Sequence, residues 1–257
     1  MSERFDLTGS VSVVTGGAGL VGHAISEALA AHGSTVVVVD PDADRGQEVA
    51  ADLGERGRHV AADVTDPAAV EAVFETVADD YDRLDVLVNS AYPRNERYGR
   101  RYEDVTTQDF RENVTSNLDA CFLPTRHAVD LMSATGGGSV INIGSIYGVQ
   151  APDFGVYEGT NMTSPVEYAV IKGGIVNLTR YLASYLGPDG IRVNAISPGG
   201  VHDGQDPRFV ERYEERTPIG RMAHPEDFGG AAVFLAAPAS AYVTGHNLVV
   251  DGGFTIC

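Results

Sequence analysis

The stretch TGGAGLVG, residues 15–22, decides the expected fold because its glycines follow a G-x-G-x-x-G pattern. The three glycines of that pattern are Gly17, Gly19 and Gly22. An apolar run, VSVVT (11–15), precedes the stretch, and a helical pattern follows it. Glycines at such a strand-to-helix turn let the backbone approach a pyrophosphate at the positive end of the helix. The stretch predicts a dinucleotide-binding loop, with a purely structural turn as the alternative.

The same alternation of short apolar runs and longer amphipathic segments continues along the whole chain. Expected strands are residues 11–15, 34–40, 58–63, 84–90, 138–144, 191–197 and 247–252. Expected helices are residues 20–31, 44–53, 67–79, 107–132, 166–186 and 225–237. This order predicts an α/β fold: a single doubly wound Rossmann domain over residues 1–257, with about seven parallel strands and helices on both faces. Two long loops, residues 91–105 and 147–167, interrupt it, and we expect them to contact the substrate.

Asp40 ends the second expected strand, 21 residues after Gly19 (40 − 19). A carboxylate at this place accepts hydrogen bonds from the adenosine ribose hydroxyls and repels a 2′-phosphate. Arg45 is the nearest cation and could support NADP, although a solvated position on the next helix is the simpler interpretation. Asp40 therefore favours NAD as the cofactor over NADP.

Lys172 is the only lysine in the chain, and all other basic residues except histidine are arginine. Tyr168 lies four residues before it in a helical stretch, so the two side chains share one face. A free phenol has a pKa of about 10, and a neighbouring ammonium lowers it towards neutral pH, where acid–base catalysis is efficient. We therefore expect Lys172 to activate Tyr168; an ordinary amphipathic helix is the alternative.

Over nearly all of its length the chain resembles the short-chain dehydrogenase/reductase family. The motifs that carry the resemblance are, in order, the glycine loop, ADV with Asp63 and Val64, NSA at 89–91, Asn117, Ser145, the Tyr168/Lys172 pair and SPGG at 197–200. It implies that Tyr168 is the general acid/base and that Ser145 hydrogen-bonds the same substrate oxygen. It implies further that Lys172 also holds the nicotinamide ribose and that Asn117 anchors a water leading to solvent.

The resemblance also implies the cofactor contacts and the partners. The implied contacts are Gly16, Gly17, Gly19, Leu20, Val21, Gly22, Asp40, Asp63, Val64, Asn89, Ser90, Ala91, Tyr168, Lys172, Pro198, Gly199 and Val201. The implied activity is hydride transfer between a nicotinamide cofactor and a CH–OH or carbonyl group of a small molecule. A homo-oligomer, dimeric or tetrameric, is expected from the same resemblance.

Several residues depart from the pattern of that family. The loop also reads T-G-x-x-G-x-x-G, a spacing typical of longer members that modify sugar nucleotides. Tyr92 stands where a glycine usually follows NSA, and Asp203 stands where a threonine usually meets the carboxamide. Ser145 and Tyr168 are 23 residues apart (168 − 145), which is more than is usual and indicates an insertion at the mouth of the site.

The two long loops are rich in Tyr, Asn and Arg and would form a polar wall. They are similar to a branch of the family associated with surface-polysaccharide and flagellin-glycan biosynthesis. A sugar, amino sugar or activated sugar is therefore the favoured substrate; a small polyol or hydroxy acid would use the same groups. Four arginines in the first loop could bind phosphate or carboxylate, although at least two are expected to be solvated: Arg94, Arg97, Arg100 and Arg101.

Two other functions stay open at this point. One is an epimerase or dehydratase that uses NAD only transiently, which the glycine-loop spacing favours. The other is a non-catalytic NAD-binding regulatory subunit, against which the presence of Ser145, Tyr168 and Lys172 argues.

Composition limits the partners and the location of the protein. The formal net charge is −18, from 36 acidic and 18 basic residues, so nucleic acid and anionic membranes are disfavoured by long-range repulsion. Cys121 and Cys257 lie far apart in the sequence, which fits a reducing cytoplasm. No signal-peptide pattern or long apolar span is seen, and the histidines show no ligand spacing, so we expect a cytoplasmic protein without a metal site.

The high acidic charge predicts adaptation to a salty cytoplasm, with a GC-rich genome that disfavours lysine as the alternative. Because salt screens repulsion between like charges, we expect the melting temperature to rise from dilute buffer to molar potassium chloride. Thermal unfolding followed by circular dichroism across a potassium chloride series checks this. Greater stability in dilute buffer would support the genomic explanation.

Overall fold

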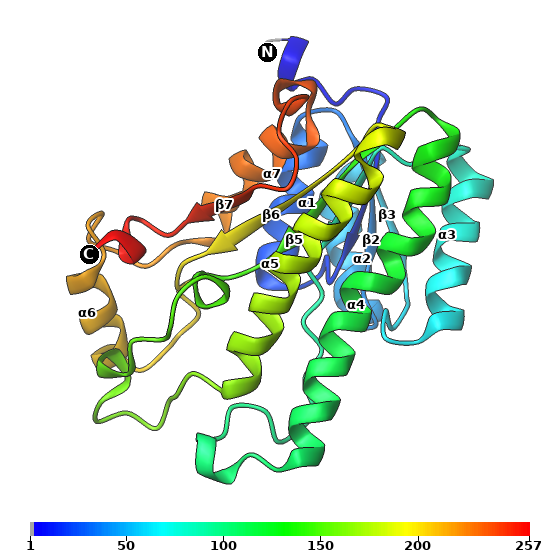
Figure 1. The fold of residues 1–257 in the computed structure, drawn as a ribbon. Coiled ribbons are helices and arrows are strands. Elements are labelled where there is room, and N and C mark those ends of the chain that lie inside the picture. The colour runs from blue at the N-terminus through cyan, green and yellow to red at the C-terminus, as the bar shows by residue number, and fades with distance from the viewer. Residues whose placement is uncertain (1–2) are drawn as a thin grey trace.

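The computed structural model describes residues 3–257 and shows one parallel sheet between two layers of helices (Figure 1). The sheet has seven strands in the order β3-β2-β1-β4-β5-β6-β7, and every pairing is parallel. The strands are β1 (Val11–Thr15), β2 (Thr35–Val39), β3 (Gly57–Val60), β4 (Val86–Asn89), β5 (Gly138–Ile143), β6 (Ile191–Pro198) and β7 (Asn247–Val250). The predicted doubly wound fold is confirmed.

Three helices cover each face of the sheet. α3 (Pro67–Tyr81), α4 (Thr107–Ala134) and α5 (Val166–Leu186) pack on one face. α1 (Leu20–Ala31), α2 (Ala43–Asp52) and α7 (Gly229–Ala236) pack on the other. The remaining helix, α6 (Pro207–Arg216), lies beside the sheet near the carboxyl end of β6 (Figure 1).

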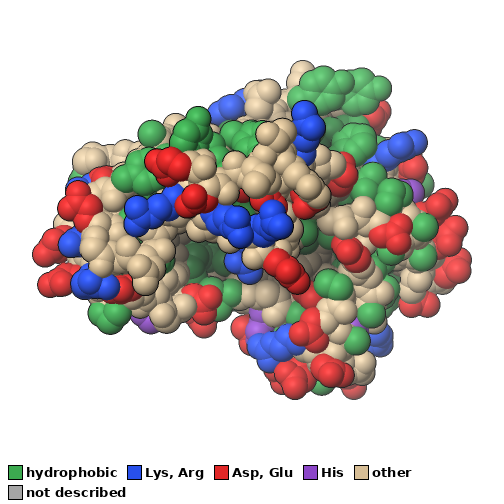
Figure 2. Space-filling view, turned by 90° about the horizontal axis from the view of Figure 1, so that it is seen from below, with side chains coloured by type: hydrophobic (Ala, Val, Ile, Leu, Met, Phe, Trp, Pro, Cys, Tyr) green, Lys and Arg blue, Asp and Glu red, His purple; other side chains and the backbone are tan. Residues whose placement is uncertain are grey.

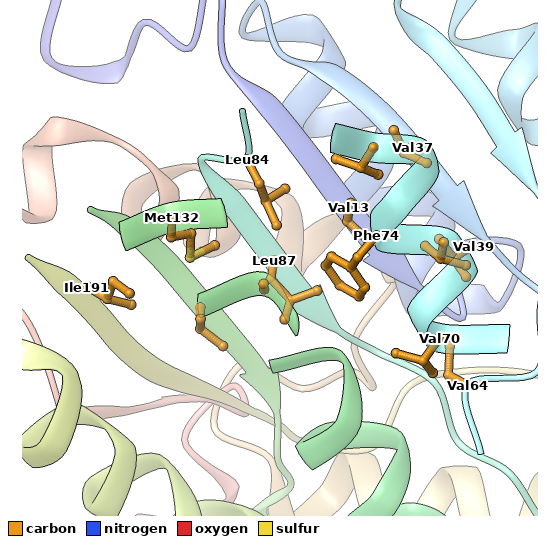
Figure 3. Close-up of a cluster of buried hydrophobic side chains, with 14 of the residues drawn as sticks. Val13, Val37, Val39, Val64, Val70, Phe74, Leu84, Leu87, Met132 and Ile191 are labelled. Carbon is orange, nitrogen blue, oxygen red and sulfur yellow. The ribbon is translucent and has the colours of Figure 1, made fainter. Parts of the chain in front are cut away.

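The core consists mainly of valine, leucine and isoleucine from strands that are covered on both sides. All five residues of β1 are buried, as are all four of β4, which explains why these strands read as continuous apolar runs. Figure 3 shows part of the core under α3 and α4, where Phe74 lies close to Val13, Val39 and Leu87. Each such side chain contributes about 1.5–3 kcal/mol on burial, so the sheet provides a rigid platform for the loops at its edge.

The helix boundaries agree with the sequence-based expectation except in two places. The segment expected as one helix over residues 225–237 is a 3₁₀ turn, Pro225–Phe228, followed by α7. α6 was not expected at all, because its sequence is dominated by charged residues. Its start did carry a usable signal: Asp206 caps the helix by accepting a hydrogen bond from the Arg208 N–H, and Pro207 follows it.

The strand order places a switch point between β1 and β4. The connection after β1 leads to one side of the sheet and the connection after β4 to the other, which opens a crevice at the carboxyl ends of these strands. The glycine loop follows β1, and the long loop 91–105 follows β4. The fold therefore brings together the two segments that the sequence singled out.

The outer surfaces of α4 and α5 carry exposed apolar side chains. Among them are Phe122, Val170, Tyr181 and Tyr185, and the last two rings stack at 6.1 Å between centroids. The expected homo-oligomer stays a prediction. None of the helices in residues 3–257 is long and apolar enough to cross a membrane.

Candidate active site

A cavity of about 590 Å³ opens at the carboxyl ends of the strands. Figure 2 shows that the corresponding face of the molecule is hollowed near its middle. Fifteen of the seventeen cofactor contacts expected from the sequence line the cavity: Gly16, Gly19, Leu20, Val21, Gly22, Asp40, Asp63, Val64, Ser90, Ala91, Tyr168, Lys172, Pro198, Gly199 and Val201. Ser145, which follows β5, lines the same cavity. Residues that follow six of the strands, β1 to β6, therefore meet in this cavity.

The glycine loop is shaped by close backbone contacts that leave no room for side chains. Gly16 has φ +63°, and a Cβ there would lie 2.6 Å from the Cα of Ala91. A Cβ on Gly22 would lie 2.2 Å from the carbonyl oxygen of Gly16. The loop is thus packed tightly against the start of α1 and against the β4 end, as a pyrophosphate-binding turn requires.

Asp40 lies where a ribose contact is expected. One of its carboxylate oxygens accepts a hydrogen bond from the N–H of Ala18 in the glycine loop, at 3.2 Å. The other accepts one from the N–H of Asp42, at 3.1 Å. These bonds fix the carboxylate at the cavity edge while leaving acceptor capacity for hydroxyl groups. Together with the glycine loop, this donor and acceptor arrangement fits a bound dinucleotide.

Ser145, Tyr168 and Lys172 line the same part of the cavity. Ser145 follows β5, and its hydroxyl oxygen accepts a hydrogen bond from the N–H of Tyr147 at 3.1 Å. Tyr168 and Lys172 lie one turn apart at the start of α5. The Lys172 amine donates to the carbonyl oxygen of Ile143 at 2.8 Å and lies 5.7 Å from the centroid of the Tyr168 ring.

Burial governs the protonation of these groups. It lowers the pKa of Lys172 to about 8, because a charged amine is poorly solvated in the interior. It also raises the pKa of Tyr168 above its ordinary value, an effect that a hydrogen bond with Ser145 partly offsets. The net direction is thus opposite to the acidic phenol expected from the sequence, and Lys172 is not among the causes of the shift in this structure. The amine is directed at Ile143, and desolvation of the phenol dominates.

Three of the expected site residues do not line the cavity. Asn117 lies on α4, and its amide donates to the carbonyl oxygens of Pro93, at 2.7 Å, and Asn113, at 2.9 Å. Asn89 donates instead into a buried network that includes Asn142, at 2.8 Å. Gly17 lies behind the loop, and a Cβ there would meet the carbonyl oxygen of Val14 at 2.9 Å. The water that Asn117 would anchor stays a prediction.

The substrate end of the cavity is more aromatic than the polar wall expected from the loops. Tyr147 and Tyr157 from the 147–167 segment line it together with Phe209 and Tyr213 from α6. Arg216 of α6 pairs with Asp153 and holds the segment against that helix. The two aromatic residues of α6 were missed because α6 itself was not expected. Tyr92, noted only as a departure, packs edge-on against Tyr168 with 5.7 Å between ring centroids.

The depressed pKa of Lys172 predicts a specific pH dependence of stability. Below pH 8 the folded protein bears the full cost of burying a charged amine. As the pH rises from about 8 towards 10.5, the folded state loses this proton before the unfolded state does. The stability of the wild type should therefore rise over that interval relative to Lys172→Met. Urea unfolding of both proteins without cofactor, at pH 7 and pH 10 and one salt concentration, measures the difference.

Other groups titrate in both proteins, so only the wild-type-minus-variant difference in unfolding free energy reports on Lys172. A difference that is the same at both pH values would show that the amine titrates normally in the folded state.

The chain is similar in sequence to a known family profile and to characterised dehydrogenases. A family profile described as Enoyl-(Acyl carrier protein) reductase matches residues 16–255. A D-threitol dehydrogenase of Mycolicibacterium smegmatis is 36% identical, with 98% of this chain and 95% of that protein covered. A galactitol 2-dehydrogenase (L-tagatose-forming) of Cereibacter sphaeroides is 34% identical, with coverages of 98% and 97%.

The flagellin branch suggested by the loops is represented by one of several distant relatives. The post-translational flagellin modification protein A of Campylobacter coli is 35% identical, with 75% of each chain covered. That identity lies between the identities to the threitol dehydrogenase, 36%, and to the galactitol dehydrogenase, 34%. The comparisons therefore support the family, and they do not single out that branch.

Solved structures of similar proteins agree with the fold over its full length. A short-chain dehydrogenase from Leptospira borgpetersenii with bound NAD⁺ has a TM-score of 0.87 and 34% identity, and 99% and 96% of the two chains are covered. A gluconate 5-dehydrogenase from Burkholderia cenocepacia in complex with NADP and tartrate has a TM-score of 0.88 and 28% identity, with coverages of 99% and 98%. The cofactor class is thus NAD(P). With this match in sequence and fold, the chain belongs to the short-chain dehydrogenase/reductase family, as an enzyme that acts on CH–OH groups.

Proposed function

We propose that the protein is an NAD-dependent oxidoreductase that interconverts a secondary alcohol and a carbonyl on a short polyhydroxylated molecule. The observation that carries this proposal is the meeting of two groups of residues in one cavity. The glycine loop and Asp40 lie at one end, and Ser145, Tyr168 and Lys172 lie at the other. When bound, the nicotinamide cofactor accepts or donates the hydride.

Tyr168 supplies or removes the proton on the substrate oxygen. Its raised pKa keeps the phenol protonated in the cofactor-free site, which is the state needed to protonate a carbonyl oxygen. Ser145, a residue that is 4% exposed, offers a hydroxyl to the same oxygen and stabilises charge that develops there. In the direction of alcohol oxidation the same phenol must first lose its proton, so charge from bound ligands has to offset burial.

Lys172 has two roles in this proposal. Its amine is within reach of the cavity and can donate to ribose hydroxyls, because an ammonium carries three donors and Ile143 takes one. Its partial charge near pH 8 makes it responsive to a ligand that brings negative charge or acceptors. Arginine would present a wide planar fork in this buried space, which is a physical reason for retaining the one lysine here.

The cavity lining and the relatives both support this substrate class. Tyr147 and Tyr157 combine apolar ring faces with hydroxyls, and their oxygens lie 3.3 Å apart. Such walls suit a molecule with several hydroxyl groups on a short carbon chain. The similarity to the threitol and galactitol enzymes favours a polyol, sugar or sugar acid. A sugar of the flagellin-glycan type is a narrower alternative, favoured by the Campylobacter coli relative.

The surroundings of Asp40 support NAD over NADP. Arg45, the nearest cation noted in the sequence, is exposed and pairs with Glu48 at 2.9 Å. It does not line the cavity. A 2′-phosphate would therefore meet the Asp40 carboxylate without a partner of opposite charge at that position.

Replacing Tyr168 tests the catalytic proposal. Tyr168→Phe removes the proton donor and should lower kcat at least about 100-fold, the usual contribution of general acid–base catalysis. Absorbance at 340 nm with polyols, sugars and sugar acids as substrates measures the rate in molar salt. Tyr181→Phe, an exposed position on the same helix, is the matched control and should behave as wild type. Unchanged turnover in Tyr168→Phe would refute the assignment. Product formation without net NADH would favour the epimerase or dehydratase alternative.

Replacing Asp40 tests the cofactor proposal. Asp40→Asn removes the charge that favours a ribose diol and opposes a phosphate, so kcat/KM for NAD should fall about tenfold or more. The value for NADP should rise in the same variant. Asp44→Asn, exposed on α2, is the control. If the ratio of the two values did not change in Asp40→Asn, another residue would select the cofactor.

A further inference from the structure

We propose that Arg94 binds a carboxylate of the substrate, and that the preferred substrate is accordingly a polyhydroxy acid. The inference rests on the proposed function, because it concerns the substrate of the same cavity. Arg94 follows β4 in the loop 91–105 and lines the cavity with Ser145, Tyr168 and Lys172. Of the four arginines that the sequence offered as anion-binding candidates, it is the one in the cavity lining.

The position of Arg94 relative to Tyr168 sets the size of the molecule that could bridge them. The guanidinium carbon lies 5.2 Å from the centroid of the Tyr92 ring. The same ring packs edge-on against Tyr168, at 5.7 Å between centroids. The guanidinium and the phenol that handles the proton therefore both contact one aromatic ring. This spacing suits a substrate whose anionic group lies several atoms from the reacting carbon.

Arg94 is available to a ligand. Within residues 3–257 no carboxylate forms an ion pair with it. Arg97 differs, since its guanidinium lies 3.7 Å from a carboxylate oxygen of Asp109. Arg100 and Arg101 are exposed and do not line the cavity. Arg94 is exposed like the other three, but it is the one that lines the cavity, and no ion pair within residues 3–257 engages it.

The backbone on both sides of Arg94 is held by α4. The carbonyl oxygen of Pro93 accepts a hydrogen bond from the Asn117 amide at 2.7 Å. The N–H of Asn95 donates to the side-chain oxygen of Asn113 at 3.0 Å. The Tyr92 ring, fixed by a hydroxyl contact with Tyr98, supports the guanidinium from one side. The backbone that carries Arg94 is therefore fixed, and only its exposed side chain has to be ordered when a ligand is bound.

The charge around this end of the cavity favours an anion. The carboxylates in the lining, Asp40 and Asp63, follow β2 and β3, at the other end of the cavity from Arg94. Figure 2 shows basic side chains beside the hollow, with acidic side chains next to them. A local positive charge is needed to bind an anion against a net charge of −18. The planar fork of a single guanidinium matches the two oxygens of one carboxylate.

The experiment compares Arg94→Gln with wild type on matched probes at one potassium chloride concentration. The probes are D-gluconate, D-glucitol and D-glucitol 6-phosphate, with shorter chains of the same three kinds. Wild type should prefer the carboxylate, and Arg94→Gln should lower kcat/KM for it at least about tenfold, mainly through KM. In the variant, the ratio of kcat/KM for the carboxylate to kcat/KM for the neutral polyol should approach one. Arg101→Gln, from the same loop and outside the cavity, should keep the wild-type ratio.

Two kinetic outcomes would overturn the inference. An equal loss of kcat/KM for D-gluconate and D-glucitol would show that Arg94 maintains the loop structure and does not recognise the charge of the substrate. A wild-type preference for the phosphate that Arg94→Gln abolishes would assign the guanidinium to a phosphate and refute the carboxylate.

Binding measurements separate this inference from the proposed function. The rise in melting temperature that D-gluconate causes in the presence of NADH is recorded for Tyr168→Phe, with and without Arg94→Gln. If no probe is turned over, the proposed function fails, while a rise that depends on Arg94 still supports carboxylate recognition. If no carboxylate probe shows binding or turnover that depends on Arg94, the inference is overturned whether or not the enzyme oxidises polyols.

Discussion

The hydrogen bond between the amine of Lys172 and the carbonyl oxygen of Ile143, at 2.8 Å, aligns the proposed catalytic groups. The amine of Lys172, a residue that is 5% exposed, must find a partner inside the protein, because a buried donor without one costs free energy. The bond joins the start of α5 to the end of β5. Ser145 lies two residues beyond Ile143, and Tyr168 lies one turn before Lys172. The relative placement of hydroxyl and phenol therefore depends on where this amine is satisfied.

Burial shifts the pKa values of Tyr168 and Lys172 in opposite directions, but both shifts favour the uncharged form of the side chain. It raises the pKa of Tyr168 and lowers that of Lys172, so it favours the neutral form of both. A neutral phenol is ready to donate a proton, and an amine near its midpoint responds to charge brought by ligands. Reasoning from the i, i+4 spacing considered only the attraction between ammonium and phenolate. It gave the wrong direction for Tyr168 because desolvation cannot be read from spacing.

The sequence predicted the sheet, five of the helices and the location of the site, because these depend on local patterns. Continuous valine runs mark strands buried on both faces, and the glycine loop marks the first strand-to-helix turn. The aromatic wall was not predictable in the same way. Phe209 and Tyr213 reach the cavity only because α6 packs against the inserted segment, through contacts such as Arg216 with Asp153. Asn89 faces the interior for a similar reason, since its partner Asn142 lies 53 residues away.

Tyr92 contacts both the proposed catalytic residues, which the family shares, and Arg94, which is proposed to bind the substrate of this chain. Its ring lies 5.1 Å from the Lys172 amine and packs edge-on against Tyr168, where a glycine would leave open space. The same ring supports the guanidinium of Arg94 on its way into the cavity. A single side chain thus desolvates the proposed catalytic pair and positions the proposed anion-binding group. Because one ring contacts both groups, a substrate that binds Arg94 and shifts the ring would also change the surroundings of Tyr168.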